Sequence, residues 1–88
     1  MEVEFTASFL RDLKAIKVKD YLNKVKSLIF ELENAHKLSD IKNVKYIVNS
    51  KIYYRIRLQD YRIGLKYDNN KVTLIRCLER KNIYKKFP

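Results

Sequence analysis

YYRIRLQDYRIGLKY, residues 53–67, alternates apolar and cationic residues through two runs that are separated by the polar corner LQD. Successive side chains of a β-strand point to opposite faces, so this alternation predicts two antiparallel strands joined by a short turn. One face of the pair is apolar, and we expect Tyr54, Tyr61 and Tyr67 to join the core from it. The other face collects Tyr53, Arg55, Arg57, Arg62, Gly64 and Lys66.

The segments on either side extend this pair into a sheet. Residues 68–71 (DNNK) predict a hairpin turn, because asparagine tolerates positive φ angles. Residues 71–79 (KVTLIRCLE) are apolar on both faces apart from Arg76, as in a central strand that is covered from both sides. At the N-terminus, residues 2–6 (EVEFT) alternate and predict a short strand. The basic tail, residues 80–88, predicts one helical turn.

Helical periodicity dominates the N-terminal half. From Val18 to Ala35, apolar residues recur at spacings of three and four, which predicts an amphipathic helix that packs on the sheet. A shorter helix precedes it, capped by Thr6 or Ser8. Residues 34–43 (NAHKLSDIKN) are polar and indicate a connection. We therefore predict an α+β fold, with an N-terminal strand and an antiparallel helix pair on one face of a mostly antiparallel sheet of about four strands. We expect the whole chain, residues 1–88, to form a single domain.

The formal net charge of +10 is unevenly distributed. Residues 1–44 carry a net charge of +1, whereas residues 45–88 carry +9. A block this cationic repels itself unless a polyanion binds it. We therefore expect nucleic acid, an acidic protein or an anionic membrane surface as the partner, in preference to a merely soluble basic protein.

Other bulk features narrow the class of protein. No apolar run of ~18 residues is present, so no segment is expected to span a membrane. The N-terminus does not resemble a secretory signal, and the single cysteine, Cys77, excludes an internal disulfide, which favours a cytoplasmic protein. The sequence shows no His, Asp and Cys cluster, no glycine-rich phosphate loop and no acidic pair for a divalent ion. We therefore expect no cofactor and no metal.

The chain has 14 Lys and 6 Arg residues, yet most of the arginines gather in the strand region. Arginine offers a planar fork that binds phosphate in a bidentate manner and stacks on rings and bases. Aromatic side chains that stack on unpaired bases are a common way of recognising single-stranded RNA. Tyr53 and Tyr84 are the tyrosines that we expect to be exposed for this purpose. The pattern therefore favours an RNA-binding face on the sheet.

Three motifs in this region resemble the RelE/ParE superfamily of toxin–antitoxin toxins, and they are closest to its RelE side. They are Tyr54-Arg55-Ile56-Arg57-Leu58, then Asp60-Tyr61-Arg62-Ile63, then Arg80 followed by Tyr84. The resemblance covers the whole chain. It implies a microbial ribonuclease-like fold and a small cytoplasmic toxin that enters the A site of the 30S ribosomal subunit and cleaves mRNA there. It also implies a RelB-like antitoxin that folds onto the toxin to give a heterotetramer.

The resemblance further implies roles for single residues. The mechanism is metal-independent: the ribose 2′-OH attacks the adjacent phosphate and leaves a 2′,3′-cyclic phosphate. Arg55 and Arg57 match the basic pair that orients the RNA and assists the nucleophile. Arg62 matches the arginine that stabilises the phosphorane, Arg80 the one beside the leaving 5′ oxygen, and Tyr84 the tyrosine that stacks on RNA.

The implied site has two parts. The catalytic residues are Arg57, Arg62, Arg80 and Tyr84. Arg76 interrupts an apolar strand, and we expect it to line the site together with Arg62. The RNA-binding residues are Lys51, Tyr53, Arg55, Lys66, Arg76, Lys81 and Lys85.

Two departures from the family pattern leave alternatives open. The basic pair is Arg-Arg where relatives often have lysine, and a guanidinium with a pKa above ~12 is a poor proton acceptor, so the general base is unassigned. Glu79 stands before Arg80, where many relatives have histidine. The alternatives are a ParE-like poison of DNA gyrase and a non-catalytic RNA- or ribosome-binding protein on the same fold. The arginine-lined face favours RNA cleavage.

Overall fold

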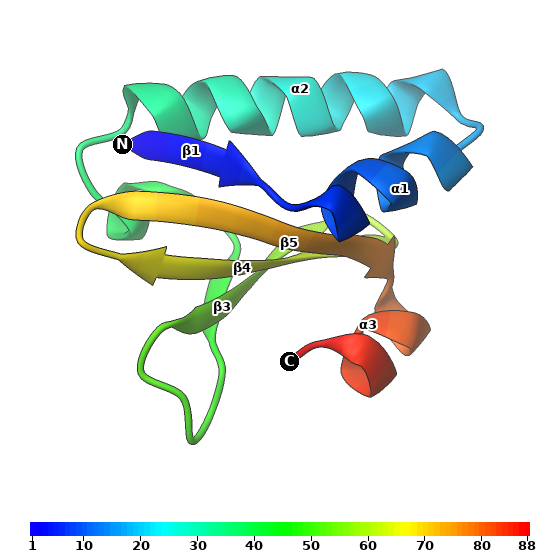
Figure 1. The fold of residues 1–88 in the computed structure, drawn as a ribbon. Helices are drawn as coiled ribbons and strands as arrows, with labels where there is room; N and C mark the ends of the chain where they lie inside the picture. Colours follow the sequence, from blue (N-terminus) through cyan, green and yellow to red (C-terminus); the bar gives the residue numbers. More distant parts are fainter.

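Five strands form one sheet in the order β1-β5-β4-β3-β2 (Figure 1). The computed structural model describes residues 1–88. The strands are β1 (Glu2–Phe5), β2 (Val44–Tyr46), β3 (Tyr53–Leu58), β4 (Tyr61–Asp68) and β5 (Lys71–Glu79). The pair β1–β5 is parallel and the other pairs are antiparallel. The predicted α+β fold with a mostly antiparallel sheet is therefore confirmed.

Helices cover both faces of the sheet (Figure 1). The helices are α1 (Ala7–Ala15), α2 (Lys19–Asn34) and α3 (Arg80–Lys86), and a short 3₁₀ helix, η1 (Leu38–Asp40), follows α2. In Figure 1, α1 and α2 run in roughly opposite directions above the sheet, and α3 lies below it. The hydroxyl of Thr6 accepts the N–H of Phe9 at 3.1 Å and caps α1, as predicted.

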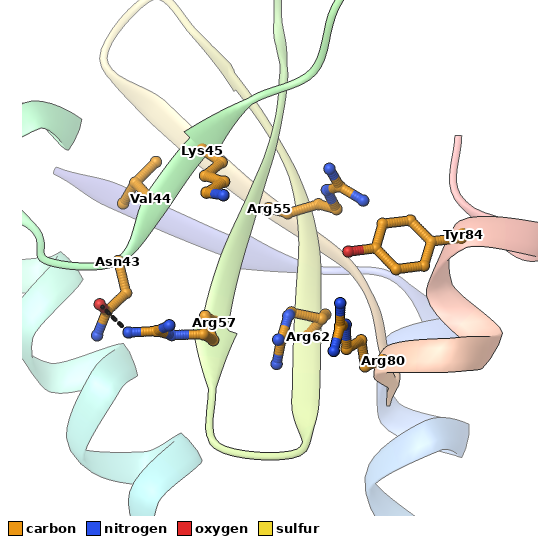
Figure 2. A pocket seen from close by; sticks show the side chains of 8 residues that line it. All are labelled: Asn43, Val44, Lys45, Arg55, Arg57, Arg62, Arg80 and Tyr84. Carbon is orange, nitrogen blue, oxygen red and sulfur yellow. Dashed lines mark hydrogen bonds between the residues drawn. The ribbon is translucent and has the colours of Figure 1, made fainter.

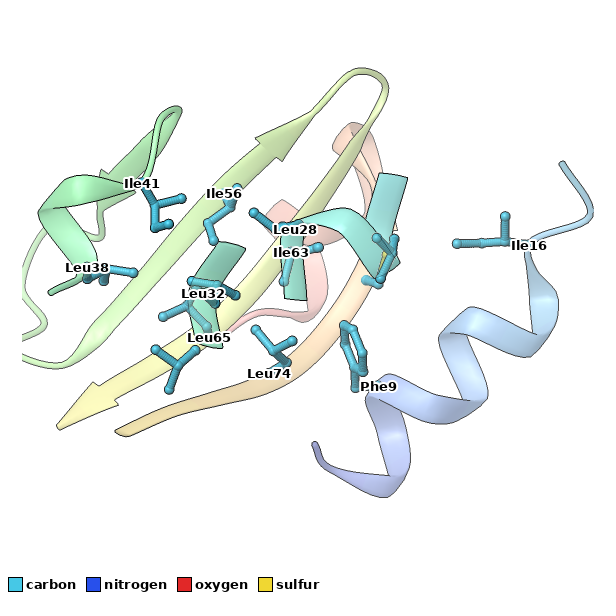
Figure 3. Close-up of a cluster of buried hydrophobic side chains, with 13 residues drawn as sticks. Phe9, Ile16, Leu28, Leu32, Leu38, Ile41, Ile56, Ile63, Leu65 and Leu74 are labelled. Carbon is cyan, nitrogen blue, oxygen red and sulfur yellow. The ribbon is translucent and has the colours of Figure 1, made fainter. Parts of the chain in front are cut away.

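The hydrophobic core lies between the sheet and the pair α1–α2 (Figure 3). Phe9 comes from α1, whereas Leu28 and Leu32 come from the buried stripe of α2. Tyr54, Tyr61 and Tyr67 pack against this core and are half-buried, in agreement with their place on the apolar face. The buried members of the core are Phe9, Ile16, Val25, Leu28, Leu32, Leu38, Ile41, Ile56, Ile63, Leu65, Val72, Leu74 and Cys77.

The second face of β4 and β5 is covered by α3. Ile83 and Phe87 are buried there, and Phe87 lies directly over Gly64. A Cβ atom at Gly64 would stand 2.5 Å from Cδ2 of Phe87, which is closer than real Cβ atoms come to other heavy atoms. Glycine is therefore required for α3 to sit this close to the sheet. Cover on both faces explains why β5 carries apolar residues on both of its faces.

Three details differ from the sequence-based expectations. The sheet has five strands because Val44–Tyr46 pairs with β3 at the edge, directly after the segment predicted as a connection. The basic tail forms the seven-residue helix α3 instead of one turn. The partner of Gly64 is Arg76, whereas the partner of Leu65 is Leu74, so Ile75 is the extra residue of a β-bulge in β5. None of the helices combines the length and the apolar composition that a membrane span requires.

Candidate active site

A pocket of about 400 Å³ lies on the sheet face that carries α3, between β2, β3, β4 and that helix (Figure 2). It contains all four residues predicted to be catalytic, and Arg55 of the predicted RNA-binding set. No carboxylate lines it. The lining residues are Asn43, Val44, Lys45, Arg55, Arg57, Arg62, Arg80 and Tyr84.

Strand register brings the cationic side chains together. Arg57 stands directly opposite Arg62 in the β3–β4 pair, and Lys45 stands opposite Arg55 in the β2–β3 pair. Like charges at directly opposed positions destabilise a sheet. The fold therefore maintains a concentration of positive charge that a bound polyanion would relieve.

Backbone oxygens fix the position of Arg62. Its Nη1 atom donates to the carbonyl oxygen of Gln59 at 2.6 Å and to the carbonyl oxygen of Tyr61 at 2.9 Å. Gln59 has a positive φ of 55° in the β3–β4 turn, and its carbonyl faces the guanidinium. The half-buried Arg62 is thus held in place before any ligand arrives, which is the condition for effective electrostatic stabilisation.

Asn43 holds Arg57 in a similar way. The side-chain oxygen of Asn43 accepts from Nη2 of Arg57 at 3.2 Å, and its carbonyl accepts the N–H of Arg57 at 3.0 Å (Figure 2). Asn43 has a φ of 65°, a value that asparagine tolerates better than most residues. Arg57 is exposed, so this neutral contact orients it without removing its charge.

Helix α3 supplies the wall formed by Arg80 and Tyr84, which lie one turn apart on the same side of the helix. The N–H of Arg80 donates to the carbonyl of Asp60 at 2.9 Å and ties the helix start to the β3–β4 turn. Hydrogen bonding from Arg80 lowers the pKa of Tyr84, and the charges of Arg55 and Arg62 contribute in the same direction. The hydroxyl of Tyr84 is therefore a stronger proton donor than an ordinary tyrosine.

The ring of Tyr84 is exposed, yet one of its faces is occupied. Cζ of Arg55 lies 4.6 Å from the ring centroid, which is a cation–π arrangement. A base that stacked on this face would have to displace Arg55. In this structure the hydroxyl of Tyr84 is therefore more accessible to a ligand in the pocket than the ring face that Arg55 covers.

The other predicted RNA-binding residues lie outside the pocket lining. Lys66 is opposite Tyr53 in the β3–β4 pair, and the ring of Tyr53 packs edge-on against Phe87 at 5.8 Å. Tyr53 is only half-exposed because of this contact. Lys51 is exposed in the β2–β3 connection, while Lys81 and Lys85 are exposed on α3. These lysines extend the positive surface around the pocket without entering it.

Arg76 does not lie where the sequence suggested. Its Nε and Nη2 atoms donate to the two carboxylate oxygens of Asp12 in α1, at 2.8 and 3.1 Å. The N–H of Cys77 also donates to Asp12, at 2.9 Å. The expectation that Arg76 lines the site with Arg62 is therefore wrong, because Asp12 binds its guanidinium at the bulge in β5. This carboxylate lies 64 positions away in the sequence.

Glu79 also lies outside the pocket. It pairs with Tyr61, whose side chain packs against the core on the face covered by α1 and α2. Glu79 also contributes to the raised pKa of Tyr61, which arises chiefly from burial. Its carboxylate therefore does not oppose an anion bound among the arginines.

Lys45 and Asn43 are pocket residues that the sequence analysis did not single out. Both belong to the segment around β2, which has only three residues in the strand and was too short to predict as one. The alternation Val44-Lys45-Tyr46 was the available signal. It indicates that Lys45 points to the opposite face from its neighbours, toward Arg55.

The structure contains no group of three or more His, Cys, Asp or Glu side chains that could hold a metal ion. Cys77 is buried in the core, and this burial raises the pKa of its thiol to about 12. The thiol is therefore a packing group and a poor nucleophile.

Comparison with known proteins gives consistent matches. The family model for the ParE toxin of the type II toxin–antitoxin system parDE matches residues 3–84. The chain is 39% identical over 90 residues to Toxin RelE3 of Methanocaldococcus jannaschii, with full coverage of both proteins.

Solved structures agree with these matches. A chain of the RelB–RelE antitoxin–toxin complex from Methanococcus jannaschii superposes with a TM-score of 0.82 and 34% identity, covering 97% of this chain and 99% of that one. The YoeB dimer from Staphylococcus aureus superposes with a TM-score of 0.72 over 91% of this chain and 97% of its own, but at 19% identity it supports the fold alone.

Proposed function

The chain belongs to the RelE/ParE superfamily of type II toxin–antitoxin toxins, and from this premise we propose that it is a RelE-like endoribonuclease that cleaves mRNA in the ribosomal A site. Its substrate is a single-stranded message held on the 30S subunit, and cleavage inhibits translation. The protein acts in the cytoplasm and needs no metal ion or other cofactor.

The convergence of Arg55, Arg57, Arg62 and Arg80 in one pocket without a carboxylate carries this proposal. Attack on a phosphodiester places additional negative charge on the phosphoryl oxygens, and fixed cations stabilise that charge. Arg62 and Arg57 are already oriented by Gln59 and Asn43. A poison of DNA gyrase is not expected to need such a cluster.

The reaction proceeds by transfer of the phosphoryl group within the RNA. The ribose O2′ attacks the adjacent phosphorus, the P–O5′ bond breaks, and a 2′,3′-cyclic phosphate forms. Arg55 and Arg57 on β3 orient the nucleotide on the side of the attacking O2′. Arg62 binds the phosphoryl oxygens, and Arg80 lies beside the leaving 5′ oxygen.

Tyr84 protonates the leaving group in this scheme. Its hydroxyl lies beside Arg80, and its pKa is lowered by that neighbour, so it donates more readily than an unperturbed tyrosine. Arginine is a far weaker acid and contributes charge only. Position and acidity together therefore favour the hydroxyl over the ring as the working part of Tyr84.

A RelB-like antitoxin neutralises the toxin. We expect it to contain an acidic and apolar segment that is disordered alone and folds onto this cationic chain to give a heterotetramer. The crystallised relative from Methanococcus jannaschii is itself a RelB–RelE complex. The net charge of +10 gives such a segment strong electrostatic attraction.

Primer extension on translated mRNA tests the nuclease. Wild-type protein should produce cuts within A-site codons, and Arg62→Ala should abolish them. Lys14→Ala is the matched control, because it also removes one positive charge but lies on α1, away from the pocket. Cuts that persist in Arg62→Ala, or no cuts by wild type, would contradict the proposal.

A poison of DNA gyrase is the second candidate, because the matching family model is that of ParE. Poisoning of DNA gyrase predicts that the cells show an SOS response while their mRNA stays intact. Translation arrest with intact mRNA would instead indicate a non-catalytic ribosome-binding protein. Both outcomes are read from the same cultures that supply the primer-extension samples.

A further inference from the structure

Lys45 is the only amine in the pocket. It lies on the edge strand β2, is exposed to solvent, and stands opposite Arg55. Figure 2 shows its side chain directed into the pocket, toward the arginines of β3. Nothing in the packing of the core requires it, since the hydrophobic cluster lies on the other face of the sheet.

The arginine pair on β3 does not provide a proton acceptor for the attacking 2′-OH. The 2′-OH must lose its proton as the O2′–P bond forms, and a guanidinium does not accept protons in the range where proteins are folded. An amine does so far more readily, and lysine is an established type of general base in enzymes. Among the pocket residues, Lys45 is the side chain on the β2–β3 side that can fill this role.

The positions of Lys45 and Tyr84 suit an in-line displacement. In such a reaction the attacking and leaving oxygens lie on opposite sides of the phosphorus. Lys45 comes from β2 and Tyr84 from α3, and Arg55 lies between them, opposite Lys45 and over the ring of Tyr84. The two proton-transfer groups thus occupy opposite walls of the pocket (Figure 2).

We propose that Lys45 is the general base of the cleavage reaction, an inference that rests on the proposed nuclease function. The neutral amine takes the proton of the 2′-OH while the O2′–P bond forms. The P–O5′ bond breaks, and the 5′ oxygen takes the proton of the Tyr84 hydroxyl. The products are the cyclic phosphate, a free 5′-OH, the ammonium of Lys45 and the phenolate of Tyr84. Proton exchange with water restores both groups.

Single-turnover cleavage on mRNA-programmed ribosomes tests this assignment. Lys45→Ala should cleave roughly 100-fold or more slowly than wild type, as general base catalysis typically contributes ~10²–10⁴-fold. Lys45→Arg, which keeps the positive charge but cannot accept the proton of the 2′-OH, should be comparably slow. Lys14→Ala should retain the wild-type rate, since it lies outside the site. Wild-type melting temperatures would show that these exposed substitutions leave the fold intact.

Chemical rescue distinguishes a general base at position 45 from a side chain that contributes only positive charge. Ethylamine should restore cleavage by Lys45→Ala, with a rate that rises with pH as the free amine becomes available. Tetramethylammonium, which is cationic but carries no proton to exchange, should not restore it, and ethylamine should not rescue Arg62→Ala.

Several results would overturn the assignment. They are full activity of Lys45→Ala or Lys45→Arg, rescue by tetramethylammonium, and failure of ethylamine to rescue. Absence of cleavage by wild type would instead refute the nuclease function itself, so the two failures are distinguishable.

Discussion

At the scale of single residues, the pKa of Tyr84 is shifted in the opposite direction from those of Tyr21 and Tyr61. Its pKa is lowered chiefly by Arg80, whereas burial raises the pKa values of Tyr21 and Tyr61, assisted by nearby acidic groups. As pH increases, Tyr84 should therefore ionise before the other two. Arg80→Gln should move the pKa of Tyr84 upward, toward the ordinary value. Carbon-13 NMR of labelled tyrosine rings measures both effects, and joint titration of all three rings would contradict them.

Gly64 controls the distance between α3 and the sheet. Gly64→Ala would place a methyl group against the Phe87 ring, and this overpacking should cost about 1–3 kcal/mol of the free energy of unfolding. It should also slow RNA cleavage, because α3 carries Arg80 and Tyr84. Phe87→Ala removes the clashing ring, so in the double variant the loss from Gly64→Ala should shrink. Urea titration of the four proteins in the cycle measures this coupling, and strict additivity would contradict the account.

At the scale of elements, the contact between α1 and β5 depends on Asp12. Asp12→Asn weakens the pairing with Arg76 and removes a charged acceptor from the N–H of Cys77, which should lower the free energy of unfolding by about 2 kcal/mol. Glu4→Gln is a matched control. It alters the exposed Glu4–Lys71 pair, at 3.6 Å, and should cost under about 0.5 kcal/mol. Equal losses measured by chemical denaturation would show that the Asp12 contact has no special importance.

The longer elements could be predicted from the sequence because each has a periodic pattern. Helix α2 and strands β3 and β4 show repeats that extend over several turns or pairs of residues. Period-two alternation alone placed Arg55, Arg57 and Arg62 on one face. Their common pocket with Arg80 and Tyr84 came from the family resemblance.

The remaining features depend on contacts between distant parts of the chain. Strand β2 has three residues, which is too few to establish a period. Its pairing with β3 is what brings Lys45 into the site. The bulge at Ile75 and the carboxylate of Asp12 together determine where Arg76 points, and neither leaves a local pattern in the sequence.

At the scale of the whole molecule, the charge asymmetry predicts binding that weakens with salt. Five cationic side chains line the pocket. If each contacts one phosphate, the affinity for a single-stranded oligonucleotide should fall with a log–log slope of roughly −3.5, about −0.7 per contact. Arg62→Ala should make the slope shallower by about one contact, and Lys14→Ala should leave it unchanged. Fluorescence anisotropy across a salt series measures the slopes, and a flat response would contradict the phosphate contacts.

Translation delivers β1 first and its sheet partner, β5, much later. Until Lys71 to Leu74 have emerged, the backbone of Glu2 to Phe5 has no strand to pair with. Helix α1 must wait as well, because it packs chiefly on β5. Such long-range pairing cannot form on a partial chain. A nascent copy of this toxin therefore cannot complete its sheet until β5 has been synthesised. The topology of the fold thus delays the formation of active toxin until near the end of translation.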